Sequence, residues 1–152
     1  MPRLPVNADP PMPRLTVALN PRFLPLLTSF VESSAHAFGL ENSKALSLTL
    51  AAEEIFAYLT KGEVRNQEIR VRCLGGGYYM GVTFTFASSD LDLRVFNLTS
   101  RLTLDQDEIP DDMGLLIAAR MTDSLHISQK AGEWQLTLSK DNAYPALIDA
   151  GV

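Results

Sequence analysis

The spacing of the apolar residues changes along this chain, and the change limits which elements it can form. Between about residues 20 and 60, apolar residues recur every three or four positions, which is the spacing of one face of a helix. From Ile69 to Phe86 they alternate with polar residues, which is typical of half-buried strands. The helical spacing returns at Met113. The chain is therefore expected to form helices, then strands, then a further helix.

A strand at Arg14–Leu19 is expected to precede two helices. Asn20 suits the cap of the first helix, and Pro21 suits its first turn, where a missing backbone N–H costs nothing. Gly39 is expected to end that helix in a left-handed conformation. The second helix is expected from Asn42 to Thr60. The residues that it is expected to bury are Leu46, Leu50, Ala51, Ile55 and Leu59.

Two hairpins with a helix between them are expected in the rest of the chain. The first hairpin pairs 67–74 with 79–86 across three glycines, and so short a turn makes the strands antiparallel. The helix is expected at Met113–Ser124. The last hairpin pairs Leu125–Ser128 with Trp134–Leu138.

These elements predict one domain with two layers. Helices on one face of a mostly antiparallel, mixed sheet make a two-layer α/β sandwich of the α+β class. The chain has 152 residues, which is enough for a single domain with a buried core. Five prolines in residues 1–13 predict a flexible arm. Residues 14–140 are expected to form the domain, and residues 141–152 a tail of unspecified order.

Composition argues against several classes of function. The net charge is −5, and nucleic-acid binding needs clustered positive charge. The sequence contains no run of about 18 apolar residues, so no membrane span is expected, and its Pro-rich start predicts no secretory signal. The single cysteine, Cys73, fits a reducing cytoplasm. His36 and His126 lack partners at zinc-ligand spacing, so no metal site is expected.

Two segments carry the residues best suited to chemistry. Residues 48–58 (LTLAAEEIFAY) hold Glu53 and Glu54, and residues 111–125 (DDMGLLIAARMTDSL) place Gly114 at the start of a helix. Together they resemble the nucleotide-binding helices of the anti-sigma factor serine/threonine kinases, a family within the superfamily of histidine-kinase and gyrase ATPases. The order of elements over residues 15–140 is similar as well. The resemblance implies the histidine kinase-like ATPase (Bergerat) fold.

The first motif of that family combines a carboxylate with a metal ligand. An acidic residue, matched here by Glu54, serves the family as general base or water positioner. An Asn one turn later holds Mg²⁺ in the family, and Tyr58 stands at that position here. A bulky phenol suits the octahedral oxygen geometry of Mg²⁺ poorly. Tyr58 is therefore expected to fill the site as a core residue with a satisfied hydroxyl.

The other two family motifs are altered as well. The family's Asp-x-Gly motif reads the adenine amino group, and the two registers considered place either Phe86 or Asp90 at its Asp. Neither residue is followed by a glycine two positions later. The family's glycine-rich turn binds triphosphate through free N–H groups, and here Asp111 and Asp112 precede Gly114. Their carboxylates repel a polyphosphate.

The altered motifs predict an anti-sigma-factor-like regulatory protein in the cytoplasm. It is expected to bind a sigma factor or an anti-anti-sigma protein, without a cofactor, and with ATP binding and kinase activity lost. The alternative is an active serine/threonine kinase that uses Mg·ATP, with Glu54 as its catalytic carboxylate, and phosphorylates an anti-anti-sigma partner. A sensor that holds another small molecule in the old pocket is a third hypothesis. Members of the family often pair, so a homodimer is also an expectation.

Overall fold

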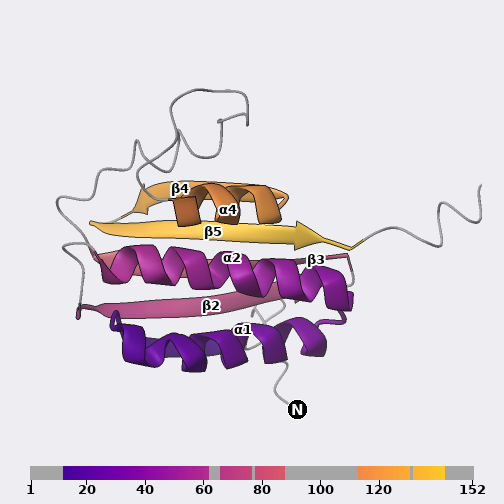
Figure 1. Ribbon diagram of the computed structural model, residues 1–152, viewed down its shortest axis with the longest axis horizontal. Helices are drawn as coiled ribbons and strands as arrows, with labels where there is room; N and C mark the ends of the chain where they lie inside the picture. The colour runs from indigo at the N-terminus through magenta and orange to yellow at the C-terminus, as the bar shows by residue number, and fades with distance from the viewer. Residues whose placement is uncertain (1–11, 62–65, 77, 88–112, 131, 143–152) are drawn as a thin grey trace, which may run out of the picture.

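A computed structural model describes residues 12–61, 66–76, 78–87, 113–130 and 132–142, which form one layer of helices on one sheet (Figure 1). The strands are β1 (Arg14–Ala18), β2 (Glu68–Gly76), β3 (Tyr79–Ala87), β4 (Ser124–Lys130) and β5 (Glu133–Asp141). The helices are the 3-10 turn η1 (Pro21–Phe23), α1 (Leu24–Ala37), α2 (Asn42–Thr60) and α4 (Met113–Met121). The expected order of elements is thus observed. Residues 88–112 and most of the expected arm and tail lie outside the described residues.

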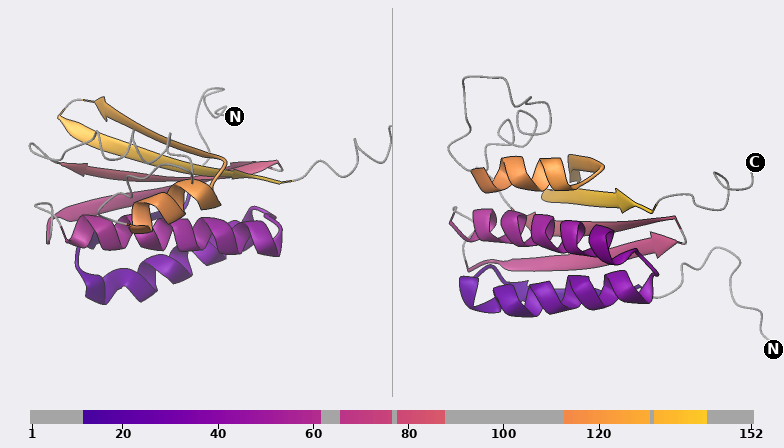
Figure 2. Two further views of the ribbon diagram at one scale, coloured as in Figure 1. Left: turned by 45° about the horizontal axis from the view of Figure 1, so that its top comes forward. Right: turned by 45° about the vertical axis from the view of Figure 1, so that its right-hand side comes forward.

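All the described helices lie on the same face of the sheet, with α2 between α1 and α4 (Figures 1 and 2). The strand order is β1-β2-β3-β5-β4, and each described pair is antiparallel. The expected two-layer α+β sandwich is therefore confirmed. The other face of the sheet carries no helix from the described part of the chain (Figure 2).

The core lies between the two layers and follows from the alternation in the sequence. The inward residues of β2 and β3 face one another in the order Ile69–Phe86, Val71–Phe84 and Cys73–Val82. All of these side chains are at most 1% exposed. The sheet is covered by one stripe of α2, which includes Leu48, Ala52 and Ile55.

The prediction that Leu46 is buried is wrong, because this side chain is 60% exposed. The stripe of α2 that faces the sheet includes Ala45 and Leu48. Each further residue turns about 100° around the helix, so Leu46 points away from that stripe. Leu50 is only half-buried for the same reason, whereas Ala51, Ile55 and Leu59 lie in the core as expected.

Local contacts set the ends of α1. The side chain of Asn20 accepts a hydrogen bond from the N–H of Arg22 at 3.0 Å, so Asn20 caps as expected, although the first turn is the 3-10 turn η1. Gly39 has the predicted left-handed conformation, with φ of 80°. Phe38 packs on Gly75 of β2, where an added Cβ would lie 2.5 Å from the ring.

The second hairpin is longer than predicted, and α4 is shorter. Helix α4 ends at Met121 rather than Ser124, because the N–H of Asp123 already donates to the carbonyl of Ser139 in the sheet. Strand β5 continues to Asp141. The next residue, Asn142, accepts a hydrogen bond from the Glu41 N–H and donates one to the Gly39 carbonyl. The packed domain thus continues beyond residue 140.

Candidate functional site

Helix α2 presents its two adjacent glutamates to different neighbours. Its buried stripe, which includes Leu48 and Ala52, lies on the sheet. Since successive residues are about 100° apart, Glu53 and Glu54 lie on opposite flanks of this stripe. Glu53 lies on the α1 flank, where the hydroxyl of Thr28 donates to its Oε1 at 2.8 Å. Glu54 therefore lies on the flank that faces α4.

Tyr58 follows Glu54 by one helical turn, so both side chains share the α4 flank. Both side chains are half-buried, and that of Tyr58 packs against the core. The expected core packing of Tyr58 is thus observed, with part of the side chain still exposed. An aromatic ring held by the core occupies the position at which the family resemblance implies a metal-holding Asn.

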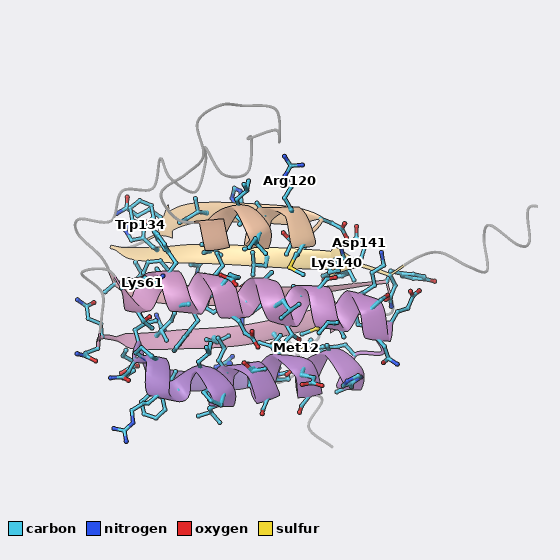
Figure 3. The ribbon with its side chains drawn as sticks, viewed as in Figure 1. Met12, Lys61, Arg120, Trp134, Lys140 and Asp141 are labelled. Atoms are coloured by element: carbon cyan, nitrogen blue, oxygen red, sulfur yellow. The ribbon has the colours of Figure 1, made fainter. Side chains whose placement is uncertain are left out.

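Helix α4 packs against α2 and carries small residues on its buried side. Gly114 and Ala118 lie one turn apart on α4, and both are buried. Their small size lets the backbone of α4 approach its neighbour closely. Arg120 of the same helix points outward (Figure 3). Gly114 therefore has a packing role, and the phosphate-binding role that the resemblance implies for its position stays a prediction.

Phe86 belongs to the core rather than to an open pocket. It lies on β3, is 1% exposed, and is flanked in the sheet by Ile69 of β2 and Trp134 of β5. A phenyl ring accepts no conventional hydrogen bond from an adenine amino group. Asp90 and Asp112 lie outside the described residues, so the choice between the two registers stays a prediction.

The structure brings four of the predicted site residues to one side of the fold. Glu54 and Tyr58 come from α2, Gly114 comes from α4, and Phe86 lies in the sheet. Helical spacing alone was enough to place the first two on one flank. Of these four side chains, only that of Glu54 is an ionisable group suited to proton transfer at neutral pH.

The structure also contains a groove that the sequence did not reveal, between α1 and α2. Its volume is about 340 Å³. The polar residues that line it are Thr28, Glu32, His36, Asn42, Thr49 and Glu53. The Oγ1 atom of Thr49 is buried and has no hydrogen-bond partner among the described residues. A threonine within the apolar stretch LTLAA was the only signal in the sequence.

Cys73 is the only cysteine and lies in the core beneath α1. Burial raises the pKa of its thiol from 9.0 to about 11, and a hydrogen bond with the hydroxyl of Ser34 acts in the opposite direction. The thiol is therefore inert at neutral pH. The described residues contain no group of three or more His, Cys, Asp or Glu that is placed to hold a metal ion.

None of the helices in the described part of the chain is both long and apolar enough to cross a membrane.

Comparison with known proteins identifies the fold. No protein-family model matches the sequence, and a search of curated proteins gives no match either. Solved structures do match. The chain is similar to one in the crystal structure of the SiaB–SiaC complex from Pseudomonas aeruginosa, with 14% identity and a TM-score of 0.59. The match covers 83% of this chain and 87% of that one.

A second similar structure contains the RsbU and RsbW domains of Rv1364c from Mycobacterium tuberculosis. Its identity is also 14%, with a TM-score of 0.56 over 86% of this chain and 32% of that longer chain. At these identities the likeness establishes the fold. It is the RsbW- and SiaB-like ATPase fold, as the order of elements in the sequence predicts.

Proposed function

We propose that this protein is an anti-sigma-factor-like regulator in the cytoplasm that acts by binding a protein partner and neither binds ATP tightly nor transfers phosphate. The observation that carries the proposal is the packing of Tyr58 against the core, one turn after Glu54. A comparison supports the partner, since one of the similar structures is a complex between two proteins, SiaB and SiaC.

Loss of nucleotide binding follows from the chemistry of the altered positions. Mg²⁺ bound to a nucleotide needs oxygen ligands in near-ideal octahedral geometry, and the ring of Tyr58 takes up space where the family has a ligand. Phe86 offers no acceptor for adenine. Asp111 and Asp112 precede Gly114 in the sequence, and carboxylates repel phosphate. Three independent changes act against the same ligand.

Isothermal titration with Mg·ATP tests this part of the proposal. We expect a dissociation constant weaker than about 0.1 mM, or no heat of binding. Thermal melting gives a second readout, because a ligand that binds the folded state raises the melting temperature. A micromolar constant would refute the loss of nucleotide binding.

The partner is expected to be a sigma factor or an anti-anti-sigma protein. The test mixes this protein with each such protein from the same genome and measures complex formation by size-exclusion chromatography with light scattering. We expect one stable complex that forms equally well with and without Mg·ATP. The same measurement on the protein alone decides whether it is a homodimer. A complex that requires Mg·ATP would contradict the proposal.

One observation favours the alternative of an active kinase. Glu54 is still partly exposed on the α4 flank, which is where the resemblance places the catalytic carboxylate. Incubation of the partner with radiolabelled Mg·ATP separates the two functions. Phosphate transfer by the wild-type protein that is abolished by Glu54→Gln supports the kinase. Our proposal expects no transfer by the wild-type protein or by the variant.

A further inference from the structure

The face of the sheet without helices carries a cluster of three arginines. Arg14 of β1 and Arg72 of β2 are direct cross-strand neighbours, and Arg70 lies two residues from Arg72 on the same face. All three residues are exposed. Because Arg70 and Arg72 alternate with the buried residues Ile69 and Val71, the cluster lies on the sheet face opposite the one that α2 covers.

A hollow of about 340 Å³ lies over these arginines. The polar residues that line it are Arg14, Thr16, Arg70, Arg72, Thr85 and Glu133, with Gln135 beside them. Among the described residues of the lining, Glu133 is the only carboxylate, and it forms a salt bridge with Arg70. The side chains of Arg14 and Arg72 form no hydrogen bond or ion pair with the residues that the structure describes.

The arrangement is unfavourable for the isolated protein. Like charges directly opposite one another on neighbouring strands destabilise a sheet. The chain has a net charge of −5, so carboxylates to neutralise these arginines are plentiful in its composition. Even so, the one carboxylate among the residues that line the hollow, Glu133, pairs with Arg70, and the guanidinium groups of Arg14 and Arg72 have no such partner among the described residues. A bound carboxylate would remove this repulsion.

We propose that Arg14, Arg70 and Arg72 form a docking site for an acidic segment of a partner protein, with carboxylates of the segment bound to Arg14 and Arg72. The guanidinium group is planar and matches a carboxylate with two parallel hydrogen bonds. Charge complementarity selects the occupant. The net negative charge of the whole chain repels a long nucleic acid, whereas a short acidic peptide meets only the local positive cluster.

This proposal does not rest on the proposed function. The docking site and the flank of α2 that carries Tyr58 lie on opposite faces of the sheet, so each proposal fails or holds by itself. Binding to the arginine cluster is expected to be the same with and without Mg·ATP.

The experiment uses a fluorescein-labelled octaglutamate peptide and measures fluorescence anisotropy at low salt. The test variant is Arg14→Ser with Arg72→Ser. The matched control is Arg22→Ser with Lys44→Ser, which removes two positive charges from the helical layer instead. We expect about tenfold weaker binding in the test variant and less than about twofold in the control. Circular dichroism melts confirm that both variants are folded.

A third variant is expected to bind the peptide more tightly than the wild-type protein. Glu133→Gln removes the carboxylate that neutralises Arg70, so it is expected to strengthen binding of the peptide about twofold to fivefold. Raising the salt concentration should weaken binding to the wild-type protein.

Three results would overturn the proposal. The first is no binding of octaglutamate to the wild-type protein at low salt. The second is an equal loss of peptide affinity in the test and control variants, which would mean that binding depends only on the net charge of the protein. The third is tighter binding of a single-stranded oligonucleotide of the same charge, with the same dependence on Arg14 and Arg72, which would assign the cluster to nucleic acid.

Discussion

The two flanks of α2 are built in different ways. The α1 flank carries polar groups between the two helices, which are the hydrogen bond from Thr28 to Glu53 and the buried hydroxyl of Thr49. The α4 flank instead has small and aromatic residues, with Gly114 and Ala118 buried on α4 and Tyr58 packed on the core. In the family that this chain resembles, the α4 flank is the one that holds nucleotide.

The difference bears on which flank of α2 can hold a small ligand. A ligand pocket needs open space and a few convergent polar groups. Tyr58 on the α4 flank and Phe86 in the sheet stand at positions where the resemblance implies polar groups, whereas the α1 flank has a groove with carboxylates and hydroxyls. If the two flanks differ in this way, substitutions on the α4 flank lower the free energy of unfolding as core substitutions do. Those on the α1 flank behave like changes of single hydrogen bonds.

The largest effect is expected for Ala118→Leu, which adds three carbons to a residue that is 0% exposed on α4. Overpacking of a filled site forces side chains and backbone to move, and we expect the free energy of unfolding to fall by about 3 kcal/mol. Urea denaturation measures it. The control is Ala119→Leu on the half-exposed side of the same helix, with little change expected. Equal stability of the two variants would show that the α4 flank is open.

Tyr58→Asn restores the family's metal ligand and tests whether Tyr58 fills the site. Because the side chain is only half-buried, the cost should be about 2 kcal/mol, below that of a fully buried aromatic residue. We also expect no gain in ATP binding, since Phe86 and Asp112 are unchanged. Urea denaturation with and without Mg·ATP measures both effects, and Tyr58→Phe is the control that keeps the ring. Micromolar ATP binding by Tyr58→Asn would show that this one residue disabled the pocket.

The pH dependence of stability probes the core beneath α1, where Cys73 lies beside Ser34. Burial raises the pKa of the thiol from 9.0 to about 11, so the unfolded chain loses this proton first as the pH rises. The contribution of the thiol to stability is fully present below pH 9 and is lost as the pH approaches 11. Between pH 9 and pH 11, the free energy of unfolding of the wild-type protein should fall by up to about 2 kcal/mol more than that of Cys73→Ala. Parallel pH profiles of the two proteins would contradict the raised pKa.

Sequence periodicity predicted the elements well and their ends less well. The bounds of α2, Asn42 and Thr60, are observed as predicted, because a long amphipathic pattern follows one stripe of the core. The end of α4 and the length of the last hairpin were not predictable, because Asp123 bonds to Ser139, a residue distant in the sequence. Tertiary contacts of this kind leave no periodic signal.

For the candidate site, positions along one helix could be predicted from the sequence, whereas contacts between separate elements could not. Helical geometry placed Glu54 and Tyr58 on one flank, since only their spacing of one turn was needed. The groove beside Thr49 forms only where α1 and α2 pack together. The arginine cluster forms only because the register of β1 on β2 places Arg14 beside Arg72. Neither the packing of two helices nor the register of a strand from another part of the chain can be read from one segment.

The smallest effect, and the most direct test of the α1 flank, is expected for Thr49→Val. The two side chains have nearly the same shape, but valine lacks the hydroxyl, which in Thr49 is buried without a partner among the described residues. An unpaired buried hydroxyl costs free energy, so its removal should raise the free energy of unfolding by about 1 kcal/mol. Thr60→Val is the matched control on the same helix, because the Thr60 hydroxyl donates to the Ala57 carbonyl at 2.7 Å. The free energy of unfolding of Thr60→Val should instead fall by about 1 kcal/mol.

Urea denaturation measures both variants. The changes in the free energy of unfolding have opposite signs if the Thr49 hydroxyl is unpaired on the α1 flank. A loss of stability in Thr49→Val would mean that a bound molecule in the groove satisfies the hydroxyl, and that the two flanks of α2 are more alike than this hydroxyl suggests.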